Sequence, residues 1–155
     1  MTDFDGFEEA AEDLEEFARR LRVFEARIPE TLDRALEKTS RKVESTASIN
    51  APKDTNRLAN SSFSRKEGRG RWVVGFSAEY AAPVEFGSEP HIITPNDADA
   101  LHFFVDGEEV FTKRVEHPGT PAQPYLRPAM REHSNDLTKH LERELEKLAK
   151  EVFAV

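Results

Sequence analysis

The stretch that decides how this chain folds reads His117-Pro118-Gly119-Thr120-Pro121-Ala122-Gln123-Pro124-Tyr125-Leu126-Arg127-Pro128-Ala129-Met130. Each of its four prolines lacks an amide donor and fixes φ, so the segment fits neither an ordinary helix nor a central strand. It also carries an aromatic and an aliphatic side chain, Tyr125 and Leu126, beside the start of a helical pattern. The sequence therefore predicts a stiff, Pro-rich arm over 117–128 that lies in one place.

A long helical pattern precedes this arm near the N-terminus. Apolar residues recur there at three- and four-residue steps, the spacing of one helical face. They are Leu14, Phe17, Leu21, Phe24, Ile28, Leu32, Leu36, Thr39, Val43 and Ala47. Pro29 interrupts the pattern, and either a kink or a second helix starting there accommodates it. We expect one helix over 7–49, kinked near Pro29, which is too long for this domain to cover and packs in part on a neighbouring subunit.

A second helical pattern follows the arm and predicts a long C-terminal helix over 126–152. Its apolar stripe consists of Met130, Leu137, Leu141, Leu145, Leu148 and Val152. The charged residues expected to face water are Glu142, Arg143, Glu144, Glu146, Lys147 and Lys150. Pro128 fits the first turn of this helix, where a missing amide costs little.

The middle of the chain, over 61–115, has the pattern of strands and turns. We expect strands at 61–65, 72–76, 91–94, 101–105 and 110–115, a turn at 66–70 and a polar loop at 95–99. Asp106-Gly107 predicts a hairpin, because a two-residue primed turn needs positive φ at both positions. A short helix over 80–87, ended by Gly87, would partly bury Tyr80, Val84 and Phe86 against the sheet.

The segment between the first helix and this region begins at Asn50-Ala51-Pro52, where the residue before proline leaves the helical region. Asp54 or Thr55 can cap a short following helix, and Asn56 tolerates a left-handed conformation. Together these patterns predict a single α+β domain over 1–155. Two long helices would bracket a central antiparallel sheet of about four strands.

Composition excludes several classes of function. The chain has 155 residues, a formal net charge of −8 and no cysteine, which removes disulfides, thiolate catalysis and cysteine metal sites. The negative charge argues against a sequence-independent DNA-binding surface but allows a surface that lets DNA pass. No apolar run approaches a membrane span, so we expect a soluble protein that is intracellular when made. The acidic balance fits a salt-adapted host and an ordinary one alike.

No residue pattern here predicts catalysis, a metal site or a cofactor site. His133 and His140 lie seven residues apart without zinc-type spacing, and Asp97 and Asp99 lack the glycine and distal glutamate of a calcium loop. Glu85 and Glu89 flank a turn, and nothing pairs them as acid and base. An enzyme hypothesis would need a small hydrolase using His91 or His117 with a nearby carboxylate, for which no nucleophile is visible.

Four blocks in order carry a resemblance to a known family. They are Ala51-Pro52-Lys53-Asp54-Thr55-Asn56-Arg57-Leu58, Tyr80-Ala81-Ala82-Pro83-Val84-Glu85-Phe86-Gly87-Ser88, Ala100-Leu101-His102-Phe103, and His117 to Ala129 of the arm. Over roughly 30–135 the chain resembles the neck, or tail-completion, family of tailed double-stranded DNA viruses of the siphovirus type. It departs at Asn56, where glycine is usual, and at Tyr125, where phenylalanine is commoner. Tyr125 then needs a hydrogen-bond partner if it is buried.

The resemblance implies a structural, non-enzymatic virion protein of the head–tail neck, assembled in the host cytoplasm. It implies a ring, expected to be six-fold, between the portal-side connector or head-completion protein and the tail terminator or tail tube. Double-stranded DNA would pass through the lumen without sequence-specific contact, and no membrane would be involved. A tail terminator or minor tail protein is the structural alternative. Subunit count, the faces that meet head and tail, bacterial or archaeal host, and any change on assembly stay open.

The blocks single out candidate residues for an assembly interface or for defining the fold. These residues belong to the first turn, the short helix or the arm. They are Pro52, Asp54, Thr55, Asn56, Tyr80, Val84, Glu85, Phe86, Gly87, Pro118, Gly119, Pro121, Pro124, Tyr125, Leu126, Arg127 and Pro128. Tyr125 and Leu126 are the anchors of the arm, and they would pack either on their own subunit or on the next one.

Overall fold

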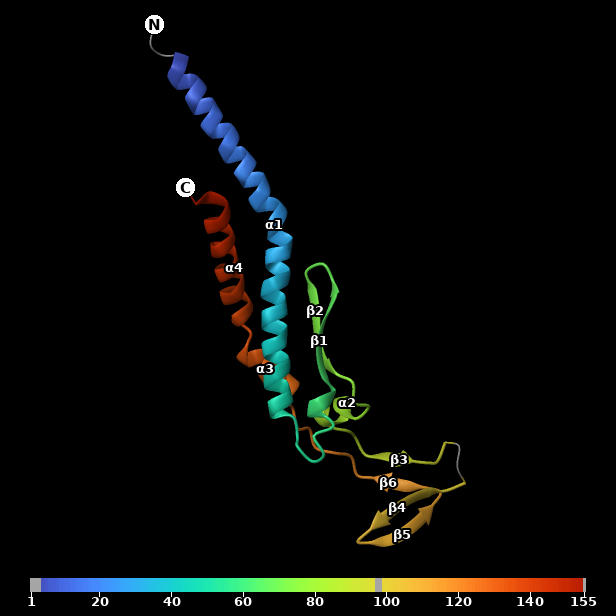
Figure 1. The fold of residues 1–155 in the computed structure, drawn as a ribbon. Helices are drawn as coiled ribbons and strands as arrows, with labels where there is room; N and C mark the ends of the chain where they lie inside the picture. Colours follow the sequence, from blue (N-terminus) through green and yellow to red (C-terminus); the bar gives the residue numbers. More distant parts are fainter. Residues whose placement is uncertain (1–3, 97–98, 155) are drawn as a thin grey trace.

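A computed structural model describes residues 4–96 and 99–154. The first element is α1, Phe4–Asn50, a helix of 47 residues that contains Pro29. Its axis changes direction partway along its length (Figure 1). Pro29 has no N–H for the carbonyl one turn earlier, which explains a bend without a break. The predicted long N-terminal helix is therefore confirmed, and it ends just before Pro52 as expected.

The C-terminal helix is interrupted, contrary to the prediction of one helix over 126–152. It consists of α3, Leu126–Glu132, and α4, Asp136–Phe153. The break falls at His133-Ser134-Asn135, where His133 Nδ1 and the Asp136 carboxylate lie 2.8 Å apart. Polar side chains that bond locally in this way compete with the helical backbone pattern, which explains the interruption.

The strands form three separate antiparallel pairs within the described residues, so the expected single sheet of about four strands is wrong. The pairs are β1, Ser62–Gly68, with β2, Arg71–Phe76; β3, His91–Ile93, with β6, Val115–His117; and β4, Leu101–Val105, with β5, Glu108–Thr112. The α+β class itself is confirmed. The loop expected at 95–99, and the rejected calcium candidate Asp97 within it, lie partly outside the described residues.

One predicted strand, over 110–115, is split between β5 and β6. The Thr112 hydroxyl donates to the Arg114 carbonyl at 3.0 Å and lies 3.3 Å from the Arg114 backbone nitrogen. That local bonding turns the chain between the strands. The hairpin signal is confirmed, because Asp106 and Gly107 have φ of 51° and 87° and join β4 to β5.

The short helix α2, Ala81–Phe86, ends at Gly87 with φ of 79°, as the pattern predicted. Val84 is half-buried, but Tyr80 and Phe86 are exposed, so their expected burial is wrong. The 3-10 helix η1, Ala59–Ser61, begins at Leu58 without a side-chain cap, so capping by Asp54 or Thr55 is also wrong. The left-handed conformation of Asn56 is confirmed by its φ of 56°.

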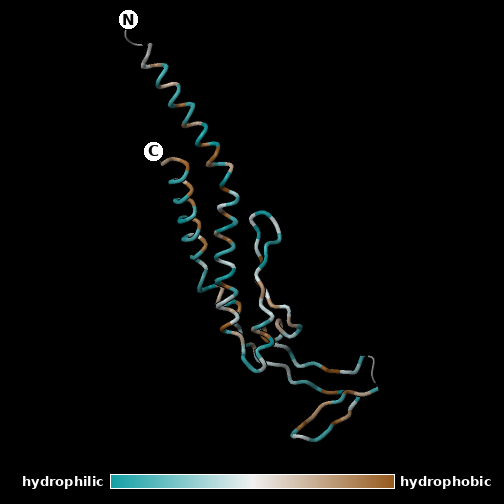
Figure 2. Tube along the Cα trace, viewed as in Figure 1, coloured by the Kyte–Doolittle hydropathy of each residue, from teal (hydrophilic) through white to brown (hydrophobic). Residues whose placement is uncertain are grey.

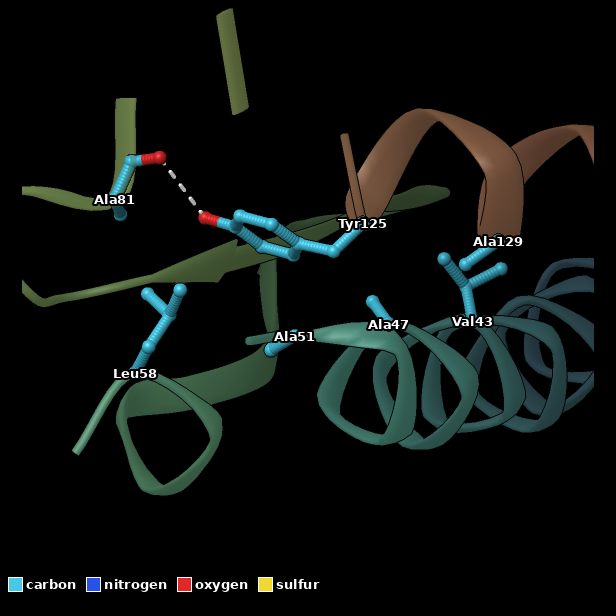
Figure 3. Close-up of a cluster of buried hydrophobic side chains, with 7 residues drawn as sticks. All are labelled: Val43, Ala47, Ala51, Leu58, Ala81, Tyr125 and Ala129. Atoms are coloured by element: carbon cyan, nitrogen blue, oxygen red, sulfur yellow. Dashed lines mark hydrogen bonds between the residues drawn. The ribbon is translucent and has the colours of Figure 1, made fainter. Parts of the chain in front are cut away.

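The hydrophobic core lies where the last turns of α1 meet η1, α2 and α3 (Figure 3). It contains Val43, Ala47, Ala51, Leu58, Ala81, Tyr125 and Ala129. From this core α4 runs back beside α1 (Figure 1). The most buried positions of α1 along that contact carry small side chains, among them Thr31 and Ala35.

Two parts of the chain project away from this body (Figure 1). The N-terminal section of α1 extends past the end of α4, and the β4–β5 hairpin extends beyond β3 and β6. Both projections carry apolar residues on the hydropathy tube (Figure 2), and the exposed side chains among them include Phe7, Leu14, Phe104 and Phe111. No helix of the described residues is long and apolar enough to cross a membrane.

Candidate assembly site

The Pro-rich arm lies along the segment that leaves α2. Ser88 and Thr120 exchange two backbone hydrogen bonds, of 2.9 and 3.0 Å, and the Gln123 N–H donates to the Val84 carbonyl at 2.8 Å. The arm is thus joined by its own backbone to the second sequence block. Among its prolines, Pro118, Pro121 and Pro124 are exposed and Pro128 is half-buried.

Gly119 permits the close approach of these two segments. Its φ is 85°, and a Cβ added there would lie 2.3 Å from the Ser88 carbonyl oxygen. Gly87 meets the arm from the other side, because a Cβ there would lie 2.8 Å from the Thr120 carbonyl oxygen. Neither position can hold a side chain without moving the arm away.

The carboxylate of Glu85 closes the start of α3. It accepts the backbone N–H groups of Tyr125 at 2.7 Å, Leu126 at 2.9 Å and Arg127 at 3.1 Å. These are donors at a helix N-terminus, which have no partner within the helix. The Arg127 side chain adds a bond from Nε to the carboxylate at 2.9 Å and another from its NH2 group to the Glu85 carbonyl at 2.9 Å. Glu85 therefore caps a helix that begins 41 residues later.

The Glu85 side chain is only 4% exposed, and the balance of its surroundings keeps it ionised. Burial by itself raises the pKa of the carboxyl, but the N–H groups of Leu126 and Tyr125 and the Arg127 guanidinium more than offset it. The resulting pKa is below its ordinary value. A buried carboxylate with this many donors is a fixed structural charge.

Tyr125 is buried in its own chain, with 2% of its surface exposed. Its ring meets Phe76 edge-on at a centroid distance of 4.6 Å, and its hydroxyl donates to the Ala81 carbonyl at 3.1 Å (Figure 3). The predicted need for a hydrogen-bond partner is confirmed. Burial, with the Glu85 charge nearby, raises the pKa of Tyr125 to about 12. Leu126 is half-buried against the same cluster.

An open hollow of about 400 Å³ adjoins this cluster. Its lining residues are Pro52, Asp54, Thr55, Asn56, Arg57, Leu58, Tyr80 and Val84. The hollow thus combines the first sequence block with the second, and the Glu85 cap combines the second with the fourth. The third block, in β4, lies apart from both.

Polar side chains hold α4 against α1. Glu144 accepts from Lys38 at 2.5 Å and from Arg34 at 3.2 Å, and it is buried, so its predicted exposure to water is wrong. The Lys38 bond is the main cause that lowers the pKa of Glu144 to about 2. Asp136 likewise has a pKa of about 2, because Lys42 and then His133 donate to it.

A chain of hydrogen bonds between helices has the order of groups seen in hydrolase triads. Thr46 Oγ1 lies 2.7 Å from His133 Nε2, and His133 Nδ1 lies 2.8 Å from Asp136. The His133 ring is buried between α1 and the α3–α4 junction, and Lys42 binds the same carboxylate. These bonds fasten the C-terminal helices to α1.

The histidines of the hydrolase hypothesis lie elsewhere, on β3 and β6. The His91 and His117 rings are 4.9 Å apart across the strand pair. His91 Nδ1 bonds the Glu89 backbone carbonyl and His117 Nδ1 accepts from the Gly119 N–H. Within the described residues neither ring bonds a carboxylate. Residues 4–96 and 99–154 also contain no group of three potential metal ligands.

Comparison with known proteins finds a match to a family of phage components over just under half of the chain. Residues 15–87 match a family described as "Bacteriophage HK97-gp10, putative tail-component". This match supports the resemblance drawn from the sequence blocks and indicates a structural component of the phage tail or neck type. It includes the first block and the second block up to Gly87, whereas the arm lies outside it. No curated protein and no solved structure matches the chain.

Sequence reasoning singled out Glu85 without finding its role. The pattern showed a glutamate beside a turn, and its partners are backbone groups forty residues away, which leave no trace in side-chain spacing. Tyr125 carries a signal that could have indicated this role. It occupies the N-cap position of α3, but its side chain accepts no hydrogen bond from the first turn of that helix. Such a helix start needs acceptors from another element.

Proposed function

We propose that the chain is a head–tail joining protein of a tailed double-stranded DNA virus. It forms a ring between the head-completion side and the tail, and the genome passes through the lumen. The observation that carries this proposal is the similarity of residues 15–87 to a phage tail-component family, over a fold whose cap and arm bring the second and fourth sequence blocks together.

The exposed apolar surface supports an assembled state. The N-terminal section of α1 and the β4–β5 hairpin project from the body and expose large apolar side chains, Phe7 at 77% and Phe104 at 65%. Monomeric proteins rarely leave such side chains in contiguous groups. Neighbouring subunits, the head-completion protein and the tail terminator or tube protein are the partners that would cover them.

The charge of the chain supports a conduit that does not grip DNA. At a net charge of −8, phosphates are repelled by most of the surface, so DNA would pass without sequence-specific contact. The candidate residues around the Glu85 cap and the adjoining hollow would then fix the shape that subunits present to each other.

The second candidate is a tail terminator or minor tail protein, because the matching family is described as a tail component. Deletion of the gene separates the two. A joining protein leaves filled heads and complete tails that do not attach, whereas a terminator leaves tails of uncontrolled length. Electron microscopy of the deletion lysate, with the wild-type gene supplied in trans as control, reads out this difference.

A further inference from the structure

The β1–β2 hairpin is a basic feature in an acidic chain. Its seven residues from Arg65 to Arg71 include four bases and one acid. Its end rests on α1, because the Gly70 N–H and the Lys66 ammonium both donate to the Asp33 carboxylate, at 3.0 and 2.5 Å. The hairpin therefore holds its charges at a fixed place beside the middle of α1.

Next to that place is a hollow of about 470 Å³, which we call the basic hollow. It is lined by Arg22, Glu25, Ala26, Ile28, Pro29 and Arg69. Its floor is partly apolar, since Ile28 is 39% exposed. Arg65 and Arg71 pair with Glu67, but Arg22 and Arg69 form no ion pair within the described residues. The hollow thus offers apolar contact and two available guanidinium groups.

The N-terminal section of α1 has the opposite character. Residues 7–16, which we call the acidic segment, contain six acids and no base. Glu16 pairs with Arg20 in the next turn, and the other five acids form no ion pair within the described residues. Phe7, Ala11 and Leu14 form an exposed apolar stripe at helical spacing, with Glu8 and Glu15 one position beyond Phe7 and Leu14.

Within one chain the acidic segment approaches the basic hollow only at Arg22, which also lines a hollow with Glu12, Glu15 and Glu16. The acidic segment and the hollow's lining residues other than Arg69 belong to one continuous helix, along which Ala11 and Ala26 are about 22 Å apart at 1.5 Å per residue. Contact of Phe7 and Leu14 with the apolar floor at Ile28 must therefore join two chains. A duplex is the rival occupant, but phosphates gain nothing from the apolar floor, and the net charge of −8 opposes their approach.

We propose that the acidic segment of one subunit docks into the basic hollow of a second copy. Glu8 and Glu15 would meet Arg22 and Arg69, while Phe7 and Leu14 would cover Ile28. The two surfaces differ, so the contact is head-to-tail and closes into a ring when the rotation between subunits allows it. This inference rests on the proposed ring and names the surfaces that would form it.

Disulfide trapping tests the contact directly, because the natural chain has no cysteine. Full-length Ala11→Cys is mixed with full-length Ala26→Cys carrying a longer tag, under oxidising conditions. We expect about tenfold more mixed disulfide than when Ala82→Cys replaces Ala26→Cys as the control, since a docked pair holds its thiols at high effective concentration. Ala82 is also an exposed alanine, on α2.

Charge exchange tests the chemistry of the contact. Arg69→Glu in the Ala26→Cys chain should reduce the mixed disulfide to the control level, and Glu8→Arg with Glu15→Arg in the Ala11→Cys chain should restore it. Circular dichroism checks that each variant is folded. A mixed disulfide no more abundant than the Ala82→Cys control overturns the proposal. The proposal is also overturned if no disulfide is trapped while the chain binds a short DNA duplex and Arg69→Glu abolishes that binding.

The outcome can be separated from that of the proposed function. If the chain is found at the head–tail joint but these cysteines do not trap, the docking contact is wrong and the function stands. If the chain is absent from particles, the function is wrong whatever the trapping shows.

Discussion

The carboxylate of Glu85, in α2, accepts the backbone N–H of Tyr125 at 2.7 Å across forty residues of sequence. Around this bond the short helix, the arm and the C-terminal helices form one unit. The same tyrosine returns a bond to α2 through its hydroxyl, to the Ala81 carbonyl. The second and fourth sequence blocks, which contain these residues, therefore form one structural element.

Replacement of Glu85 by glutamine should destabilise the chain strongly. The amide group would place donors against the N–H groups at the start of α3 and would leave Arg127 without its charge partner. Loss of a buried, multiply bonded carboxylate costs about 2–4 kcal/mol of unfolding free energy. Urea unfolding measures it, with Glu89→Gln as control because Glu89 is exposed in the same segment. Equal effects of the two variants would contradict the role of the cap.

Replacement of Tyr125 by phenylalanine should separate the ring from the hydroxyl. We expect a loss of about 0.5–1.5 kcal/mol for the bond to Ala81, against about 3–5 kcal/mol for Tyr125→Ala, which removes the buried ring. Thermal and urea unfolding give both values. If Tyr125→Ala leaves the isolated chain fully stable and abolishes only assembly, the ring belongs to an interface instead.

The same hydroxyl predicts a loss of stability in alkali. Because the folded pKa of about 12 lies above the ordinary value of 10.0, the neutral form is favoured in the fold. Its contribution is complete below about pH 10 and declines as pH rises toward 12. Tyr125→Phe should lack this part of the decline in melting temperature between these pH values, and an unchanged pH profile would contradict the assignment.

The contact between α1 and α4 should weaken in acid. Glu144 and Asp136 have folded pKa values of about 2, below their ordinary values of 4.5 and 3.8. Their contribution is present above about pH 4.5 and is lost as pH falls toward 2. Over this window the melting temperatures of Glu144→Gln and Asp136→Asn should change less with pH than that of the wild type. Glu142→Gln, on the exposed face of α4, is the control and should keep the wild-type slope.

Gly119→Ala should detach the arm, because the new Cβ would meet the Ser88 carbonyl oxygen. Gly107→Ala is its matched control, since that glycine also has positive φ, 87°, but nothing lies within 4 Å of an added Cβ. Backbone strain of about 1–3 kcal/mol is common to both variants. Gly119→Ala should therefore be the more destabilised of the two by urea unfolding, and similar losses would show that the close approach is unimportant.

The sequence predicted best what depends on local patterns. The long helix with Pro29 inside it, the Asp106-Gly107 hairpin and the end of α2 at Gly87 all follow from residue chemistry within a few positions. The same holds for the left-handed Asn56. These features need no knowledge of what packs against them, and the structure confirms each.

Features that depend on distant partners could not be predicted in this way. Alternation identifies strands but not their neighbours, so it predicts one sheet of about four strands where the described residues form three separate pairs. Glu144 has the spacing of a water-facing residue and is buried because Lys38 and Arg34 of α1 lie opposite. The break before α4 depends on how Asp136 bonds His133.

Within the candidate site, the sequence identified the residues but not their roles. Phe86 and Tyr80 were expected to be partly buried and are exposed, whereas Glu85 between them is buried. A six-residue helix presents too few turns for periodicity to distinguish its faces. Apart from the Arg127 side chain, the partners of the Glu85 carboxylate are backbone N–H groups, which any residue except proline can supply.

The most direct test of the central claim is a reconstruction of purified virus particles with the chain located in the density. The account predicts a ring of this chain at the joint between head and tail, with the genome channel through its centre. A chain located in the capsid shell or the baseplate, or missing from mature particles, would contradict it.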